Sequence, residues 1–354
     1  MLAHLILSQL AMGQYGLANI KTLFDEEGTA EAVLRKIGKS FTNEETVAKE
    51  EIAWCEQNKV RILTISDADY PERLRHCPDA PMVLFTRGKA DLNASHIISI
   101  VGTRQCTQYG KDITAAIVKD LASLCPDIMI VSGLAYGIDI NAHRAAFNNN
   151  LPTIGVVAHG QDTLYPSMHR NDANRMCLGN GGVITEFFHG TSSIAPYFLQ
   201  RNRMIAGMSD ATIVIESATR GGGLATARMA QEYNREVFAV PGPINAEYSK
   251  GCNNLIRDNK AALITSAEDI INALQWQNAN ALQEIHRKGV ERQLFPELTP
   301  EEQKVVECLK QGDMQTNILA MQTSIPIGTL TALLFSLEMK GVIKPLSGNT
   351  YHIV

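Results

Sequence analysis

The sequence predicts an α/β protein: a doubly wound, Rossmann-like parallel sheet between a small N-terminal helical domain and a C-terminal winged helix. Three observations predict it. Short apolar helical segments come first, strand and helix patterns then alternate regularly, and a separately capped unit follows. The 354 residues suffice for two or three domains. Hydrophobic residues make up 45% and charged residues 19%, a balance typical of globular rather than disordered chains.

Residues 1–75 are expected to form short helices. Apolar residues such as Leu7, Leu10 and Ile20 recur at helical spacing, with a turn at Gly13–Gly16. Two glycines between apolar helices suggest a helix-hairpin-helix, which would offer backbone N–H groups to DNA phosphates. Their spacing differs from the usual Gly-x-Gly, so a plain helical cap is favoured over a true hairpin.

Residues 76–274 are expected to form the Rossmann-like domain. From about residue 96, short apolar, β-branched runs alternate with helical stretches. Such runs are typical of parallel strands that helices cover on both faces. The expected strands are 96–101, 127–131, 153–157, 183–185, 211–215, 237–240 and 261–264.

The remaining residues are expected to form a linker, 275–297, which is rich in amides, and a winged helix, 298–354. The winged helix offers few cations, which favours protein contacts or a structural role over DNA binding. Its expected elements are a helix beginning at the capping box Thr299-Pro300-Glu301-Glu302, a second helix near 316–322, a third with the stripe Leu330, Leu333, Leu334 and Leu337, and a β-hairpin turning at Ser347-Gly348-Asn349.

The charge distribution limits the possible ligands. The net charge is −5, and residues 1–80, 81–274 and 275–354 carry −4, 0 and −1. Because none of these parts is basic, a nucleic acid would have to be held by a few placed arginines rather than by a basic surface.

Several classes of protein are disfavoured. No apolar run approaches the roughly 18 residues of a membrane helix, and the N-terminus makes a poor signal peptide, so a cytoplasmic location is expected. The seven cysteines are never closer than 19 residues apart, which excludes C-x-x-C zinc and redox motifs. No pair of histidines has ligand spacing with an acid, so no metal is expected.

Glycine-containing or polar loops follow the expected strands. In an open parallel sheet, such loops meet at one rim, where ligands bind. Glycine lets a backbone approach a ligand closely, and helix N-termini attract anions, so the loops together predict a phosphate-bearing ligand. They are residues 102–104, 132–137, 159–162, 186–188, 217–223 and 241–245.

The familiar nucleotide motifs are absent. Val33 stands where a Walker A loop ending at Ser40 needs glycine, and the first βα turn lacks G-x-G-x-x-G. We therefore expect neither a P-loop ATPase nor a dinucleotide dehydrogenase, and no cofactor.

Read together, the loops resemble the DprA (Smf) family of bacterial DNA-processing proteins, closely over about 60–274 and more loosely elsewhere. The resemblance implies a Rossmann-like core that binds single-stranded DNA, forms a homodimer and helps load the RecA recombinase in natural transformation. It implies no catalytic reaction and no metal. The matching segments are SIVGTR at 99–104, VSGLAYGIDINAH at 131–143, Tyr165-Pro166, RNRMIAG at 201–207, FAVPG at 238–242 and GCNNLI at 251–256.

The resemblance also implies where the DNA site lies. Arg104 is the leading candidate, because a guanidinium can hold two phosphate oxygens in a planar fork. Arg201 and Arg203 point roughly 200° apart on a helix, so one is expected to bind phosphate while the other braces the loop, unless both are structural. Glu186 and Glu216 are candidate partners for the brace. The expected DNA-binding residues are Gly102, Thr103, Arg104, Gly133, Arg201, Asn202, Arg203, Gly221, Gly222, Gly223, Thr226 and Lys250.

The chain departs from the family pattern in places. Gly221-Gly222-Gly223 stands where the family usually has Ser-Gly-Ser, so hydroxyl contacts are lost there while the backbone N–H groups remain. His169 stands where an asparagine is usual. These departures put individual contacts in doubt rather than the family.

The alternative function is a nucleotide hydrolase of the LOG-like phosphoribohydrolase type, which has a similar core. Its motif, Pro-Gly-Gly-x-Gly-Thr-x-x-Glu, when laid on Thr226, puts Met229 at the position of the acid. Methionine cannot act as an acid or base, so this alternative is disfavoured. A scaffold that binds only protein is a third possibility.

Overall fold

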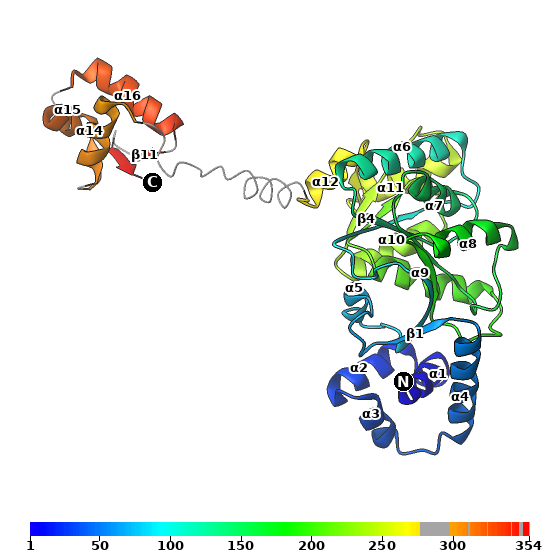
Figure 1. Ribbon diagram of the computed structural model, residues 1–354. Coiled ribbons are helices and arrows are strands. Elements are labelled where there is room, and N and C mark those ends of the chain that lie inside the picture. Colours follow the sequence, from blue (N-terminus) through cyan, green and yellow to red (C-terminus); the bar gives the residue numbers. More distant parts are fainter. Residues whose placement is uncertain (277–297, 311, 324, 341, 347–349, 354) are drawn as a thin grey trace. The chain divides into compact units, whose positions relative to one another are not determined.

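The computed structural model describes residues 1–276, 298–310, 312–323, 325–340, 342–346 and 350–353 (Figure 1). The chain divides into two compact units, Met1–Leu274 and Gln275–Val354. Each unit is described by itself.

The first unit begins with a cluster of four helices. α1 is almost wholly buried because it contacts α2, α3 and α4 together, and Leu5 and Leu7 are fully enclosed. Gly13 and Gly16 lie in the turn between α1 and α2, as expected. The helices are α1 (Leu2–Met12), α2 (Leu17–Glu27), α3 (Ala30–Ile37) and α4 (Thr42–Gln57).

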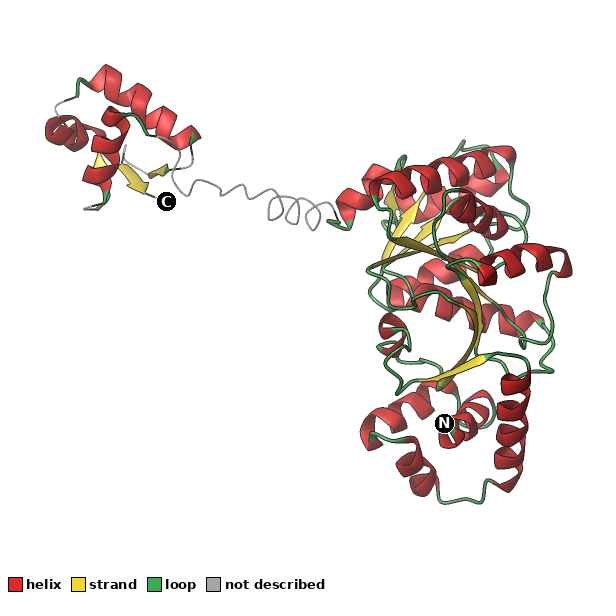
Figure 2. Ribbon diagram, viewed as in Figure 1, coloured by secondary structure: helices red, strands yellow, loops and turns green. Residues whose placement is uncertain are grey.

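A sheet of nine strands forms the centre of this unit (Figure 2). Its order is β1-β2-β6-β5-β4-β3-β7-β8-β9; β3 to β9 are parallel, while β2 pairs antiparallel with both β1 and β6. The strands are β1 (Arg61–Thr64), β2 (Val83–Gly88), β3 (His96–Val101), β4 (Ile128–Ser132), β5 (Thr153–Val156), β6 (Gly182–Thr185), β7 (Ala211–Val214), β8 (Glu236–Ala239) and β9 (Ala262–Leu263).

The seven expected strands are all present, and the predicted fold class is confirmed. β1 and β2 were missed, and the expectation that residues 1–75 are wholly helical was wrong for β1. Both strands lie in an antiparallel pair at one side of the sheet; β1 begins with the exposed Arg61, whereas β2 begins with a buried apolar run at residues 83–85 and ends half-exposed. The boundary expected at residue 75 stays a prediction.

Helices cover both faces of the sheet (Figure 1). From β3 to β6, each successive strand lies nearer to the β1 edge of the sheet, and α6, α7 and α8 connect these strands. From β7 to β9, each successive strand lies nearer to the opposite edge, and α10 and α11 connect them. The strand order therefore reverses between β3 and β7, where a doubly wound sheet opens a crevice. The helices are α5 (Glu72–Arg75), α6 (Gln108–Leu124), α7 (Ile138–Asn148), α8 (Arg170–Leu178), α9 (Ala195–Gly207), α10 (Gly222–Glu232), α11 (Lys250–Arg257) and α12 (Ala267–Ala273), with short 3-10 turns at Ser167–His169 and Glu247–Ser249.

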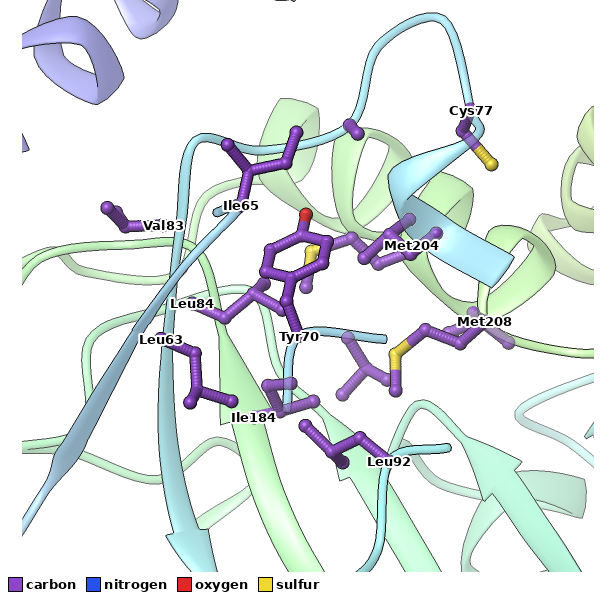
Figure 3. Packing of buried hydrophobic residues seen from close by; sticks show 14 of the residues in the cluster. Leu63, Ile65, Tyr70, Cys77, Val83, Leu84, Leu92, Ile184, Met204 and Met208 are labelled. Atoms are coloured by element: carbon purple, nitrogen blue, oxygen red, sulfur yellow. The ribbon is translucent and has the colours of Figure 1, made fainter. Parts of the chain in front are cut away.

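Tyr70 joins the edge of the sheet to α9. Its ring lies among Leu63, Leu84, Ile184 and Met204 (Figure 3). The ring is fully buried, and its hydroxyl donates a hydrogen bond of 2.7 Å to the carbonyl of Pro81. Because a buried hydroxyl needs such a partner, this hydrogen bond orients the ring, and the packing of the ring with Met204 holds the segment between β1 and β2 against the helix that carries Arg201.

The second unit is a winged helix, as expected. Its three-stranded sheet has the order β10-β12-β11, and Leu330, Leu334 and Leu337 of the predicted stripe are fully buried in its core. The predicted linker lies almost wholly outside the described residues, and so does the predicted turn at 347–349. The elements are α14 (Pro300–Leu309), β10 (Met314–Gln315), α15 (Thr316–Thr323), α16 (Ile327–Met339), β11 (Ile343–Leu346) and β12 (Thr350–Ile353).

No single helix in the described part of the chain is long and apolar enough to cross a membrane. Only α15 and α16 taken together meet that length and composition, and they are bent by 109°.

Glu302 ties the winged helix together. The predicted capping box is present: Glu302 N–H donates to Thr299 Oγ1 at 3.3 Å, and Thr299 N–H donates to the Glu302 carboxylate at 2.8 Å. Ser336 of α16 and Lys340, which directly follows α16, donate hydrogen bonds to the same carboxylate. Burial opposes the charge, but these hydrogen bonds prevail and lower the pKa of Glu302 from 4.5 to about 2.

We predict that Glu302→Gln destabilises the winged helix by about 1–3 kcal/mol near neutral pH, because charge-assisted hydrogen bonds are lost. A lowered folded-state pKa gives stability that is complete above about pH 4.5 and is lost as the pH falls towards 2. Calorimetry of the full chain should therefore show the difference shrinking over that range. Glu301→Gln, at an exposed neighbour, is the control; an undiminished difference at the acid end would contradict the assignment.

Candidate nucleic-acid interface

A cleft of 580 Å³ opens where the strand order reverses. It lies between the loop after β3, the loop after β7, one side of α9, and the turn before α11. This volume is in the range of sites that bind small molecules or parts of larger ones. Most of the predicted DNA-binding residues line it: Gly102, Thr103, Arg104, Arg201, Asn202, Gly221, Gly222, Gly223 and Thr226.

The loop after β3 forms one wall. A side chain at Gly102 would put its Cβ 2.5 Å from Ile138 Cγ1 and 2.9 Å from the Glu216 carbonyl, so only glycine fits. Thr103 N–H donates to that carbonyl at 2.8 Å, which joins the loop to the end of β7. Arg104 follows with its side chain exposed.

Arg104 is held over an aromatic ring. Its guanidinium carbon lies 4.8 Å from the ring centre of Phe198 on α9. Among the described residues its side chain has no hydrogen bond or ion pair. A cation–π contact steadies a guanidinium while leaving its N–H groups free to bind an anion.

The start of α10 forms the opposite wall. Gly221 precedes the helix without a side-chain cap, so backbone N–H groups of the first turn keep their capacity to bind an anion. Gly223 packs directly against Gly102, which brings the two walls together. Thr226 is buried, and its hydroxyl donates to the Gly222 carbonyl at 3.1 Å, so it supports the wall.

Arg201 forms the floor of the cleft. Its side chain donates to the carbonyls of Gly133, at 2.6 Å, and Val156, and its Nε donates to Asn202 Oδ1 at 3.3 Å. It is only 3% exposed, and no carboxylate in the described part of the chain forms an ion pair with it. Burial lowers the pKa of Arg201 to about 10, which leaves it charged at neutral pH.

Asp139 faces this arginine across Gly133. A Cβ on Gly133 would lie 2.6 Å from both Asp139 Oδ2 and Arg201 Nη1, so glycine is required between them. Burial raises the pKa of Asp139, against the opposing effect of the Arg201 charge. Gly133 was a predicted site residue; it supports the floor through its carbonyl and does not line the cleft.

Arg203 lies outside the cleft. It forms an ion pair with Glu186, one of the two candidate partners for a bracing arginine, and donates to the Asp79 carbonyl. Both charged side chains are nearly fully buried. Arg203 leaves α9 on a different side from Arg201. Its contacts with Glu186 and Asp79 connect α9 to the rest of the fold. Glu216, the other candidate, instead accepts hydrogen bonds from Thr107 at the start of α6.

Three of the predicted residues, Gly133, Arg203 and Lys250, do not line the cleft, and some residues that do line it were not predicted. Lys250 is exposed at the start of α11 and does not line the cleft. Arg220 does line it; its position directly before Gly221 was the available signal. Phe198 and Asp139 also line it, and only their proximity to Arg201 and Gly133 in the fold reveals them.

Known protein families match most of the chain. The family model for DNA recombination-mediator protein A matches residues 61–275, and that for the DprA winged helix domain matches 291–349. The chain is 37% identical over 217 residues to DNA processing protein DprA of Streptococcus pneumoniae, covering 61% of this chain and 75% of that one. It is 31% identical over 325 residues to Protein Smf of Synechocystis, covering 84% and 81%. For Protein Smf of Escherichia coli, 36% identical, the match spans 64% of this chain and 59% of the relative's length.

Two solved structures are similar. The X-ray structure of DprA from Streptococcus pneumoniae has a TM-score of 0.60 at 30% identity and covers 76% of this chain and 92% of that one. A structure of DNA processing protein A from Helicobacter pylori, described by its single-stranded DNA binding mode, has a TM-score of 0.55 at 28% identity and covers 61% and 97%.

We predict that Arg203→Met lowers the free energy of unfolding by about 3–5 kcal/mol, because Glu186 is left as a buried, unpaired charge. Arg203→Met/Glu186→Leu should recover most of this loss. Urea denaturation measures both. Arg220→Met, at an exposed arginine, should change the value by less than about 0.5 kcal/mol. An unchanged urea midpoint for Arg203→Met would show that the pair does not brace the fold.

Proposed function

The chain belongs to the DNA recombination-mediator protein A family, and from this premise we propose that its cleft binds single-stranded DNA. The observation that carries the proposal is the combination of a buried arginine with no ion pair among the described residues and exposed arginines around it. A buried charge is costly unless it is paired; Asp139 offsets the Arg201 charge only from a distance, and a phosphate would supply a direct pair. The Helicobacter pylori relative is described by its binding of single-stranded DNA.

Each group has a role in this proposal. Arg201 at the floor and Arg104 at the rim hold phosphate oxygens with planar guanidinium groups. The N-terminal turn of α10 adds backbone N–H groups, and Arg220 adds a third cation. None of these contacts reads a base edge, so binding should depend little on sequence.

We further propose that the bound strand is passed to the RecA recombinase during natural transformation, and that the protein acts as a homodimer. These roles follow from the family and rest on the relatives named DNA processing proteins. The protein would then act as a mediator without a catalytic step.

The hydrolase alternative finds no support at the corresponding position. Met229 of α10, where the related motif has its acid, packs against the hydrophobic core and does not line the cleft. The carboxylate of Asp139 does line the cleft, but it interacts with Arg201 and with the backbone of its own loop. These contacts give it a structural role.

We predict that Arg104→Ala weakens binding to oligo-dT by about 1.5–3 kcal/mol, roughly ten- to a hundredfold, because charge-assisted hydrogen bonds to phosphate are lost. The melting temperature should hardly change, since the side chain is exposed. Arg104→Lys should recover binding only in part, because a point charge replaces a fork. Fluorescence anisotropy of a labelled oligonucleotide measures the affinities of the wild type and both variants, and thermal denaturation measures the melting temperature.

The matched control is Arg35→Ala, at an exposed arginine of α3. It removes the same charge away from the cleft and should leave affinity unchanged. If Arg104→Ala melts early yet binds oligo-dT normally when folded, Arg104 is a brace and the assignment of the rim is wrong.

The salt dependence of binding should be shallow. Each phosphate contact of a single strand contributes about −0.7 to the slope of log affinity against log salt concentration. With a few arginines at the cleft, this slope should be about −2 to −4. Titrations at several salt concentrations give this slope. A value near −8 would indicate a broad basic surface.

A further inference from the structure

A second groove, of 340 Å³, lies beyond the α10 wall of the cleft. It is formed by α10, α11 and the turn that leads to β9, and its polar lining includes Arg228, Gln231, Asn254 and Lys260. One segment, residues 219–224, separates it from the cleft. Ala218, Arg220 and Gly221–Gly223 face the cleft, while Thr219 and Leu224 line the groove.

The two hollows share a fixed boundary. Gly251 at the start of α11 donates its N–H to the Ser217 carbonyl at 2.8 Å, and Ser217 N–H donates to the Tyr248 carbonyl at 2.6 Å. On the far side, Gln231 of α10 donates to the Lys260 carbonyl at 2.7 Å. The groove is thus built from elements that are hydrogen-bonded to each other and to the loop that lines the cleft.

The charges of the groove favour an anion. Lys260 is exposed, and no described residue pairs with its ammonium group. Arg228 is also exposed, and its ion pair with Glu232 is long, at 3.9 Å. Asp258, the acid in the lining, is already paired with Arg257 at 2.9 Å. Neither cation of the lining is held by a close ion pair, so both are available to a ligand, while the ionised Asp258 is paired with Arg257 and is also attracted by Lys260.

We propose that this groove is a second phosphate-binding subsite, which holds the continuation of the DNA strand after it leaves the cleft over residues 219–224. This inference rests on the proposed function of the cleft. Continuity favours the same strand as occupant over a separate small anion, because only the single segment 219–224 lies between the two sites. Lys250, a predicted DNA-binding residue that does not line the cleft, directly precedes Gly251 of the groove lining in the sequence.

The test compares short and long strands on the full chain. Oligo-dT of about 3 nucleotides should occupy the cleft alone, whereas about 12 nucleotides, within the roughly 4–16 that single-strand-binding folds cover, should reach the groove. Arg228→Ala/Lys260→Ala should weaken binding of the long strand by about three- to tenfold, a modest loss because both cations are exposed. It should also make the salt slope shallower by about 1.4, for two contacts at about 0.7 each. Binding of the short strand should be unchanged.

The control is Arg35→Ala/Lys119→Ala, which removes one arginine and one lysine from exposed positions on α3 and α6. If the groove variant binds the long strand as tightly as the wild type, or loses affinity equally for both lengths, the subsite is refuted. If the wild type binds neither strand, the proposed function itself fails. If Arg104→Ala weakens both lengths and the groove variant weakens neither, only the groove inference fails.

Discussion

The reversal of strand order between β3 and β7 is the constraint on which the rest of the site depends. The chain leaves these two neighbouring strands towards opposite faces of the sheet, so their following loops separate and a cleft opens between them. The walls approach each other closely because Gly223 has no side chain, since a Cβ there would lie 3.2 Å from the Cα of Gly102. α9 crosses back at this point, between β6 and β7, and carries Arg201 into the floor. One topological feature thus places the glycines, the helix start and the arginine together.

Two buried arginines on α9 differ in how their charges are paired. Arg203 has a carboxylate partner in Glu186, so its charge is satisfied within the fold. Arg201 is equally buried but is held by carbonyl groups, and the nearby Asp139 attracts its charge without forming an ion pair. A low-polarity site strengthens its attraction for any anion that enters. Under the proposed function, this contrast rather than overall charge would let a chain with a net charge of −5 hold a phosphate backbone.

The sequence predicted the parallel strands almost to the residue, because strands buried on both faces form continuous apolar runs. It missed β1, since an edge strand with an exposed residue such as Arg61 lacks that pattern, and it also missed β2, although residues 83–85 form a buried apolar run. The glycine loops and Arg104 were predicted from their places after strands. Helical spacing showed that Arg201 and Arg203 diverge, but not which of them faces the cleft, because that depends on how α9 lies on the sheet. Arg220 was not predicted because an exposed side chain leaves no periodic signal, and Phe198 was not predicted because its place beside Arg104 depends on how α9 packs. That residues 219–224 lie between the cleft and the groove also follows only from the fold.

Hydrogen exchange measured by mass spectrometry on the full chain, with and without oligo-dT, tests the central claim most directly. Binding in the cleft should slow exchange of backbone amides at 102–107 and 217–226, where the loop after β3 and the start of α10 would meet phosphates. Exchange in α14, α15 and α16 should be unchanged. Protection confined to the winged helix, with none at the two loops, would contradict the account.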